Sequence, residues 1–135
     1  MSEPIVTNLA KIWNDENGIV HILFFQRNEF TEGDADEYIK SCLKISGGKP
    51  ALVLIDFSNV NYLFTGTYKK LLSPELTAIT KASAVVVGPS SNFVVSGISF
   101  LMNLKKEPFP IKIFTNEKDA RDWLLTMKDK GKTSP

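Results

Sequence analysis

Few residues of this 135-residue chain belong to the types that carry out catalysis or bind metals. The sequence has one histidine, His21, and one cysteine, Cys42. His21 stands within a predicted strand, where a lone histidine is typical of a packed polar residue, and no motif places an acid or a nucleophile near it. Cys42 falls on the apolar face of a predicted helix, as an inert small hydrophobic residue does. These two residues allow no internal disulfide and no zinc site of soft ligands, and we expect no cofactor.

Asp56 is the one carboxylate whose position suggests a site. It ends a predicted strand that is otherwise apolar, and in parallel α/β sheets ligands bind beyond the carboxyl ends of such strands. The alternative is structural: Asp56 accepts hydrogen bonds from Ser58, Asn59 or the loop backbone and holds a turn. Both interpretations stay open at this point.

The overall composition excludes some classes of protein. Lysine and arginine number 16 and aspartate and glutamate 15, so the net charge of +1 argues against a non-specific nucleic-acid binder. Residues 1–10 lack the basic segment and apolar run of a secretory signal. The longest apolar stretch has about 12 residues, too few to span a bilayer. We therefore expect a cytoplasmic protein without a transmembrane segment.

The elements that must position these residues begin with a β-hairpin. Apolar-rich runs at residues 10–14 and 19–25 are separated by Asp15-Glu16-Asn17-Gly18, and Asn-Gly supplies the positive φ angles of a tight turn. A helix then begins after Thr31, with Asp34 placed to complete a capping box, and ends before Gly47. Its predicted buried face consists of Ala35, Tyr38, Ile39, Cys42 and Leu43.

Strands and helices alternate through the rest of the chain. The helix predicted at residues 66–81 contains Pro74, so it is either kinked or divided there. The other expected elements are strands at 51–56, 82–87 and 111–114, a helix at 92–105, and a last helix capped by Asn116 with Ala120, Trp123, Leu124 and Met127 on one face. The order β-β-α-β-α-β-α-β-α predicts a single α/β domain with a mostly parallel sheet. We place this domain at residues 8–127, followed by a disordered tail at 128–135.

The segment Asp56-Phe57-Ser58-Asn59-Val60 and this order of elements resemble the STAS domain of anti-sigma factor antagonists, the SpoIIAA-like proteins. The pattern in that family is D-[LF]-S-x-V-x-x-h-D-S-S-G, where h is apolar, and Leu63 matches the apolar position. The turn at residues 46–50 and the ending at 113–117 with Trp123-Leu124 resemble a group of uncharacterised bacterial STAS/SEC14-like proteins. The resemblance covers about residues 12–125 and implies a SpoIIAA-like fold.

In the SpoIIAA-like family a partner kinase phosphorylates the second serine of the pattern, at the start of the following helix. That position is Gly66 here, and its neighbours are Thr65 and Thr67. The resemblance makes these two threonines the candidate phosphorylation sites, because a phosphate at a helix N-terminus is electrostatically favourable. The alternative is that they cap the helix.

The predicted helix at residues 92–104 has more apolar surface than one buried face requires. One stripe (Phe93, Gly97, Phe100, Leu101 and Leu104) is enough to pack on a sheet, and a second stripe consists of Val94, Val95, Ile98 and Met102. Exposed apolar patches usually mark binding, so we expect the second stripe to form a homodimer or partner surface. The alternative is that the helix at 66–81 or the loop at 108–110 covers it.

Two functional hypotheses follow. The leading one is a non-enzymatic STAS-like module that acts through protein–protein contacts. The other, which the SEC14-like resemblance allows, is a small carrier or sensor of an apolar ligand, with a site lined by Asp56, Tyr62, Phe64, Phe93 and Met102. An enzyme ranks third, because the sequence presents no recognisable set of base, nucleophile and metal ligands.

Overall fold

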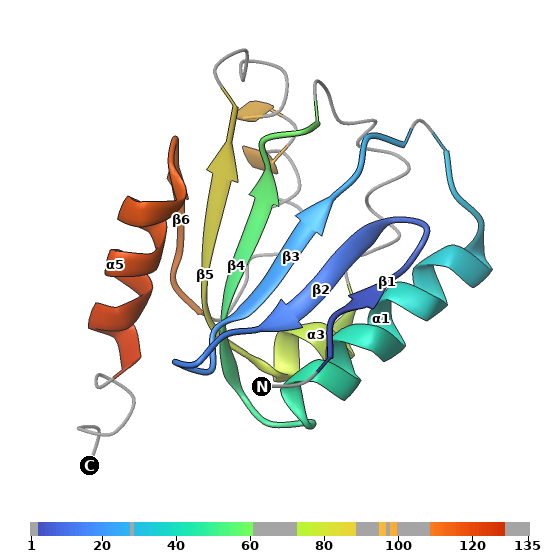
Figure 1. Ribbon diagram of the computed structural model, residues 1–135, viewed down its shortest axis with the longest axis horizontal. Coiled ribbons are helices and arrows are strands. Elements are labelled where there is room, and N and C mark those ends of the chain that lie inside the picture. Colours follow the sequence, from blue (N-terminus) through green and yellow to red (C-terminus); the bar gives the residue numbers. More distant parts are fainter. Residues whose placement is uncertain are drawn as a thin grey trace.

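A six-stranded β-sheet with its strands in sequence order lies at the centre of the fold (Figure 1). The computed structural model describes residues 3–27, 29–60, 73–88, 95–96, 98–99 and 109–128. The strands are β1 (Ile5–Val6), β2 (Ala10–Asn14), β3 (Val20–Phe24), β4 (Ala51–Phe57), β5 (Thr80–Val87) and β6 (Ile111–Phe114), and the helices are α1 (Glu32–Ser46), α3 (Pro74–Ala78) and α5 (Glu117–Lys128).

The sheet is antiparallel from β1 to β3 and parallel from β3 to β6. The predicted hairpin is confirmed: β2 and β3 pair across the loop at residues 15–18, in which Gly18 has a φ of +80°. β1 was not predicted, because two residues are too few to show a period of two. Thr7 returns the chain from β1 into β2, since its Oγ1 accepts hydrogen bonds from the backbone N–H groups of Leu9 and Ala10. The sheet thus includes residues before the predicted domain start at residue 8.

The ends of α1 are those that the sequence predicts. Thr31 and Asp34 form the capping box, and Gly47 ends the helix in the left-handed conformation with a φ of 69°. The buried face differs from the prediction at its edge. Leu43 and Ile39 are half-buried, and the fully buried residues are Ala35, Tyr38, Ser41, Cys42 and Ile45. The helix is therefore rotated slightly from the expected orientation.

The helix predicted at residues 66–81 ends earlier than expected. Ser73 caps α3 with Pro74 in its first turn, and α3 stops at Ala78. The helix ends there because the next residues pair with β4. The backbone N–H of Ala51 donates to the carbonyl of Ile79, and Thr80 pairs with Ala51 as the first residue of β5. Residues 61–72, which include the upstream half of that prediction, lie outside the described residues.

The order of the strands decides which face each helix covers. Each parallel crossover moves one strand along the sheet in the same direction, so right-handed connections put their helices on a single face. Accordingly α1 and α3 lie on one face, where Ile98 also packs, and α5 follows the last strand and covers the other (Figure 1). Asn116 caps α5 as predicted, and Ala120 and Leu124 are its fully buried residues. Within the described part of the chain, no helix is long and apolar enough to cross a membrane.

Candidate functional site

A cavity of about 180 Å³ lies between the sheet and the helices α1 and α3. Its floor is formed by alternate residues of the parallel strands, such as Val53, Ile55 and Val85, which all point to the same face. Tyr38 and Cys42 of α1 contribute to the opposite wall. The cavity is partly open, and its surface is almost entirely apolar. A concave space with mostly apolar walls is typical of a site for a small molecule.

The ionisable groups that line this cavity stay neutral. Burial raises the pKa of the Tyr38 hydroxyl well above its ordinary value, and the neighbouring Cys42 thiol adds to the shift. Burial also raises the pKa of Cys42 to about 12, although a hydrogen bond with Tyr38 acts in the opposite direction. A thiol with that pKa is not a nucleophile at neutral pH, so Cys42 serves here as part of an apolar wall, as the sequence predicted.

Asp56, the member of the predicted ligand site that the structure describes, does not line this cavity. Asp56 lies on β4 between Ile55 and Phe57, so its side chain points to the α5 face of the sheet and away from the cavity. Its Oδ1 accepts a hydrogen bond from the backbone N–H of Ser58 at 2.8 Å. This hydrogen bond supports the turn-holding interpretation of Asp56. The other residues of that prediction, Tyr62, Phe64, Phe93 and Met102, lie outside the described residues.

The predicted partner surface is corrected at Ile98. Residues 95–96 and 98–99 are helical, as expected, but Ile98 is only 5% exposed and lines the cavity. Val95 is half-buried against the same core, while Ser96 and Ser99 are exposed. This segment lies over the sheet, so Ile98 and Val95 of the second apolar stripe pack against the core instead of facing outward. Val94 and Met102 lie outside the described residues, as do the candidate phosphorylation sites Thr65 and Thr67.

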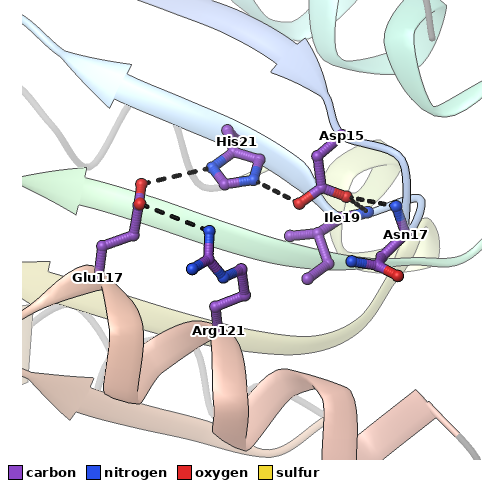
Figure 2. A network of polar contacts seen from close by, with 6 residues as sticks. All are labelled: Asp15, Asn17, Ile19, His21, Glu117 and Arg121. Atoms are coloured by element: carbon purple, nitrogen blue, oxygen red, sulfur yellow. Dashed lines mark hydrogen bonds and ion pairs between the residues drawn. The ribbon is translucent and has the colours of Figure 1, made fainter.

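A polar network on the α5 face is the second candidate site (Figure 2). His21 on β3 is 5% exposed, and its Nε2 lies 2.9 Å from Oδ2 of Asp15. Its Nδ1 lies 3.9 Å from Oε1 of Glu117 on α5, and Glu117 in turn is 3.8 Å from Nη1 of Arg121. The Trp13 ring stacks on the imidazole, with the ring centroids 5.0 Å apart. No motif in the sequence places an acid near His21, but the hairpin loop brings Asp15 and α5 brings Glu117 close to it.

Asp15 serves mainly to hold the hairpin loop. Its Oδ1 accepts hydrogen bonds from the backbone N–H groups of Asn17 and Ile19, while Oδ2 faces His21. Burial on its own raises the pKa of Asp15, but the bonds from His21, Ile19 and Asn17 together outweigh it and lower the pKa. Among the described residues, the polar partners shown for His21 are the two acids Asp15 and Glu117. No group of three or more His, Cys, Asp or Glu side chains in that part of the chain is placed to hold a metal. The network fits a structural role, as the sequence suggested for His21.

A protein-family model matches residues 12–128, and it is described as a domain of unknown function, DUF7793. The chain belongs to the DUF7793 family. No curated protein matches this DUF7793 domain. Among solved structures, it is similar to an uncharacterised protein of the DUF3478 family from Shewanella loihica PV-4, described as having a SpoIIAA-like fold. The two share 18% sequence identity with a TM-score of 0.60, over 92% of this chain and 98% of the other.

At this identity the likeness shows the fold alone. It confirms the SpoIIAA-like fold that the motif around Asp56 and the order of elements predicted. The DUF7793 domain is thus an α/β domain whose sheet is partly parallel. Neither the description of the family nor that of the similar structure states an activity. The function of this chain must therefore be argued from its own cavity.

Sequence reasoning did not single out Ser83 on β5, one of the described residues that line the cavity. Ser83 is a buried polar residue among Ala82, Ala84 and three valines, at 4% exposure. A serine in the middle of a strand that is apolar on both sides is a signal that the sequence does carry. The position of Ser83 in a cavity lining could not be derived, because it depends on how far α1 and α3 stand from the sheet.

Proposed function

We propose that this DUF7793 domain is a non-enzymatic binding module of STAS type that holds a small apolar molecule in the cavity between the sheet and the helices α1 and α3. The observation that carries the proposal is the cavity itself, with its volume of about 180 Å³ and its apolar lining. An apolar cavity of roughly 150 Å³ is already large enough for a benzene molecule. The space here therefore suits a ligand of one ring or a short branched chain.

The energetic cost of such a cavity supports this proposal. Unfilled apolar space costs about 24 cal/mol per Å³, which for this volume is at most about 4 kcal/mol, since the cavity is partly open. The whole free energy of unfolding of a domain is about 5–15 kcal/mol. A ligand that makes the missing van der Waals contacts would offset a large part of that cost.

The chemistry of the lining favours binding over catalysis. The only two ionisable side chains among its described residues are Tyr38 and Cys42, and both have raised pKa values. General acid–base catalysis near neutral pH requires a group whose pKa lies close to 7. A role as a protein-interaction module remains compatible with the SpoIIAA-like fold, but the burial of Ile98 removes a central residue of the surface that we had predicted for it.

The proposal is tested by thermal unfolding of the purified chain with and without toluene. We expect toluene to raise the unfolding temperature, because a ligand that binds only the native state stabilises it by mass action. In Val53→Phe the new ring occupies the cavity, so toluene should have no effect. The matched control is Leu23→Phe, which adds the same ring on β3, where Leu23 faces away from the cavity.

The proposal is wrong if toluene leaves the unfolding temperature of the unmodified chain unchanged at concentrations near its solubility. It is equally wrong if Val53→Phe and the unmodified chain respond to the same extent, because binding would then occur elsewhere. Native mass spectrometry of protein purified from cells would also reveal the mass of any ligand that stays bound.

A further inference from the structure

Ser83 is the residue of the cavity that least resembles its surroundings. It lies on β5 with Val53 of β4 on one side and Ile111 of β6 on the other, and its side chain points to the cavity face of the sheet. The residue is 4% exposed. A buried hydroxyl is costly unless it finds a hydrogen-bond partner, so an alanine or valine would be the ordinary residue in this place.

The other serine and threonine hydroxyls of the described lining have acceptors within the chain. Ser46 Oγ donates to the carbonyl of Leu43 at 3.1 Å, and Ser73 Oγ donates to the Glu75 carboxylate. Thr77 and Thr80 donate to the carbonyls one helical turn before them, at 3.2 and 2.7 Å. Ser83 is the one hydroxyl of the described lining for which the structure shows no hydrogen bond, and it is therefore free to bond with a ligand.

The lining also restricts the charge of a ligand. None of the described residues that line the cavity is Asp, Glu, Lys, Arg or His. A carboxylate, phosphate or ammonium group inside would therefore lose its hydration without gaining a counter-charge, which is a large penalty. A neutral polar group loses much less, and one hydrogen bond from protein is enough to compensate it.

We propose that Ser83 binds the single polar group of a neutral, otherwise apolar ligand, such as the hydroxyl of a phenol or an alcohol. This inference rests on the proposed function, because it assigns the kind of molecule that the cavity accepts. The hydroxyl of Ser83 both donates and accepts, so it can pair with a ligand hydroxyl in either direction. The remaining apolar walls contact the hydrocarbon part.

The experiment compares two probes of nearly equal size, toluene and 4-methylphenol, by titration calorimetry. The preference for 4-methylphenol over toluene should fall roughly 2- to 12-fold in Ser83→Ala, the factor that one net hydrogen bond contributes. Ser83→Cys, which keeps the size but bonds weakly, should behave like Ser83→Ala. The matched control is Ser41→Ala, because Ser41 is also buried but does not line the cavity. It should keep the preference of the unmodified chain.

The outcomes separate this inference from the proposed function. If both probes bind and the preference is the same in Ser83→Ala as in the unmodified chain, the assignment of Ser83 is wrong while the cavity still binds apolar molecules. Binding of 4-methylbenzoate as tight as that of 4-methylphenol would overturn the requirement for a neutral ligand. If neither toluene nor 4-methylphenol binds, the proposed function itself fails.

Discussion

The two faces of the sheet are packed in different ways. On the α5 face, Ala82 and Ala84 of β5 meet Ala120 of α5, and all three side chains are at most 1% exposed. Small residues on both surfaces let a helix approach a sheet closely, and Leu124 fills the remaining space with 0% exposure. The α5 face is therefore a dense core.

On the opposite face, the described helices that cover the strands are α1 and α3. Val53, Ile55 and Val85 point toward α1 and α3, and α3 has only five residues. Between these elements the cavity of about 180 Å³ stays unfilled by side chains of the described residues. One sheet thus carries a face specialised for stability and a face with space for a ligand, so substitutions on the two faces should have different effects.

The largest difference is expected for leucine truncations on the two faces. Leu124→Ala removes a side chain with 0% exposure from the α5 face and should lower the free energy of unfolding by about 2–5 kcal/mol. Leu76→Ala, on α3, should cost less, because Leu76 is half-buried and already borders the cavity. Urea unfolding of both variants measures the difference. Equal losses would contradict the contrast between a dense and a hollow face.

A second comparison enlarges a valine on each face. Val86→Phe overpacks the α5 face and should lower the free energy of unfolding by about 1–3 kcal/mol. Val53→Phe places the same ring in the cavity, so its free energy of unfolding should stay within about 0.5 kcal/mol of the unmodified chain, or exceed it. Both are measured by urea unfolding. A large loss for Val53→Phe would mean that the cavity does not accept a ring.

The smallest effect concerns the polar network at the edge of the α5 face. The pKa of Asp15 is lower in the folded chain than its ordinary value of 3.8, so its carboxylate stabilises the fold above that pH. This contribution disappears as the pH falls through the folded pKa. Asp15→Asn should therefore cost about 1 kcal/mol near pH 6 and progressively less as the pH falls toward 2, because the unmodified carboxyl becomes protonated as well.

Unfolding in urea across this pH range checks the prediction for Asp15. Glu16→Gln is a suitable control, because Glu16 is an exposed acid in the same loop and forms none of the hydrogen bonds described for Asp15. A loss in Asp15→Asn that is equally large at pH 2 would show that the effect is steric and unrelated to charge.

Much of the fold follows from local signals in the sequence. The capping box of Thr31 and Asp34, the left-handed Gly47 and the loop before Gly18 are short-range features, and each lies where it was predicted. The motif at Asp56 also predicted the SpoIIAA-like fold, which the similar solved structure confirms. The end of α3 was predicted less well, because the pairing of Thr80 with β4 overrides the helical pattern.

The candidate site could be predicted only in part. The periodicity of residues 92–104 identified apolar side chains in excess, but it could not tell an inward surface from an outward one, and Ile98 proved to be buried. The proximity of Asp15 to His21 is set by the geometry of the hairpin loop. The proximity of Glu117 depends on how α5 packs on the sheet, which no spacing in the sequence indicates. The cavity could not be predicted from the sequence either, because its volume depends on the distances between packed elements.

The most direct test of the account is a toluene titration of ¹⁵N-labelled protein followed by two-dimensional NMR. The account predicts that the largest shifts fall on backbone amides beside the cavity, such as those of Val53, Ser83 and Cys42. The amides of Ala120 and Leu124, on the dense side of the sheet, should stay in place. An unchanged spectrum, or shifts that centre on α5, would contradict the claim that the α1 and α3 face of this DUF7793 domain is a binding site.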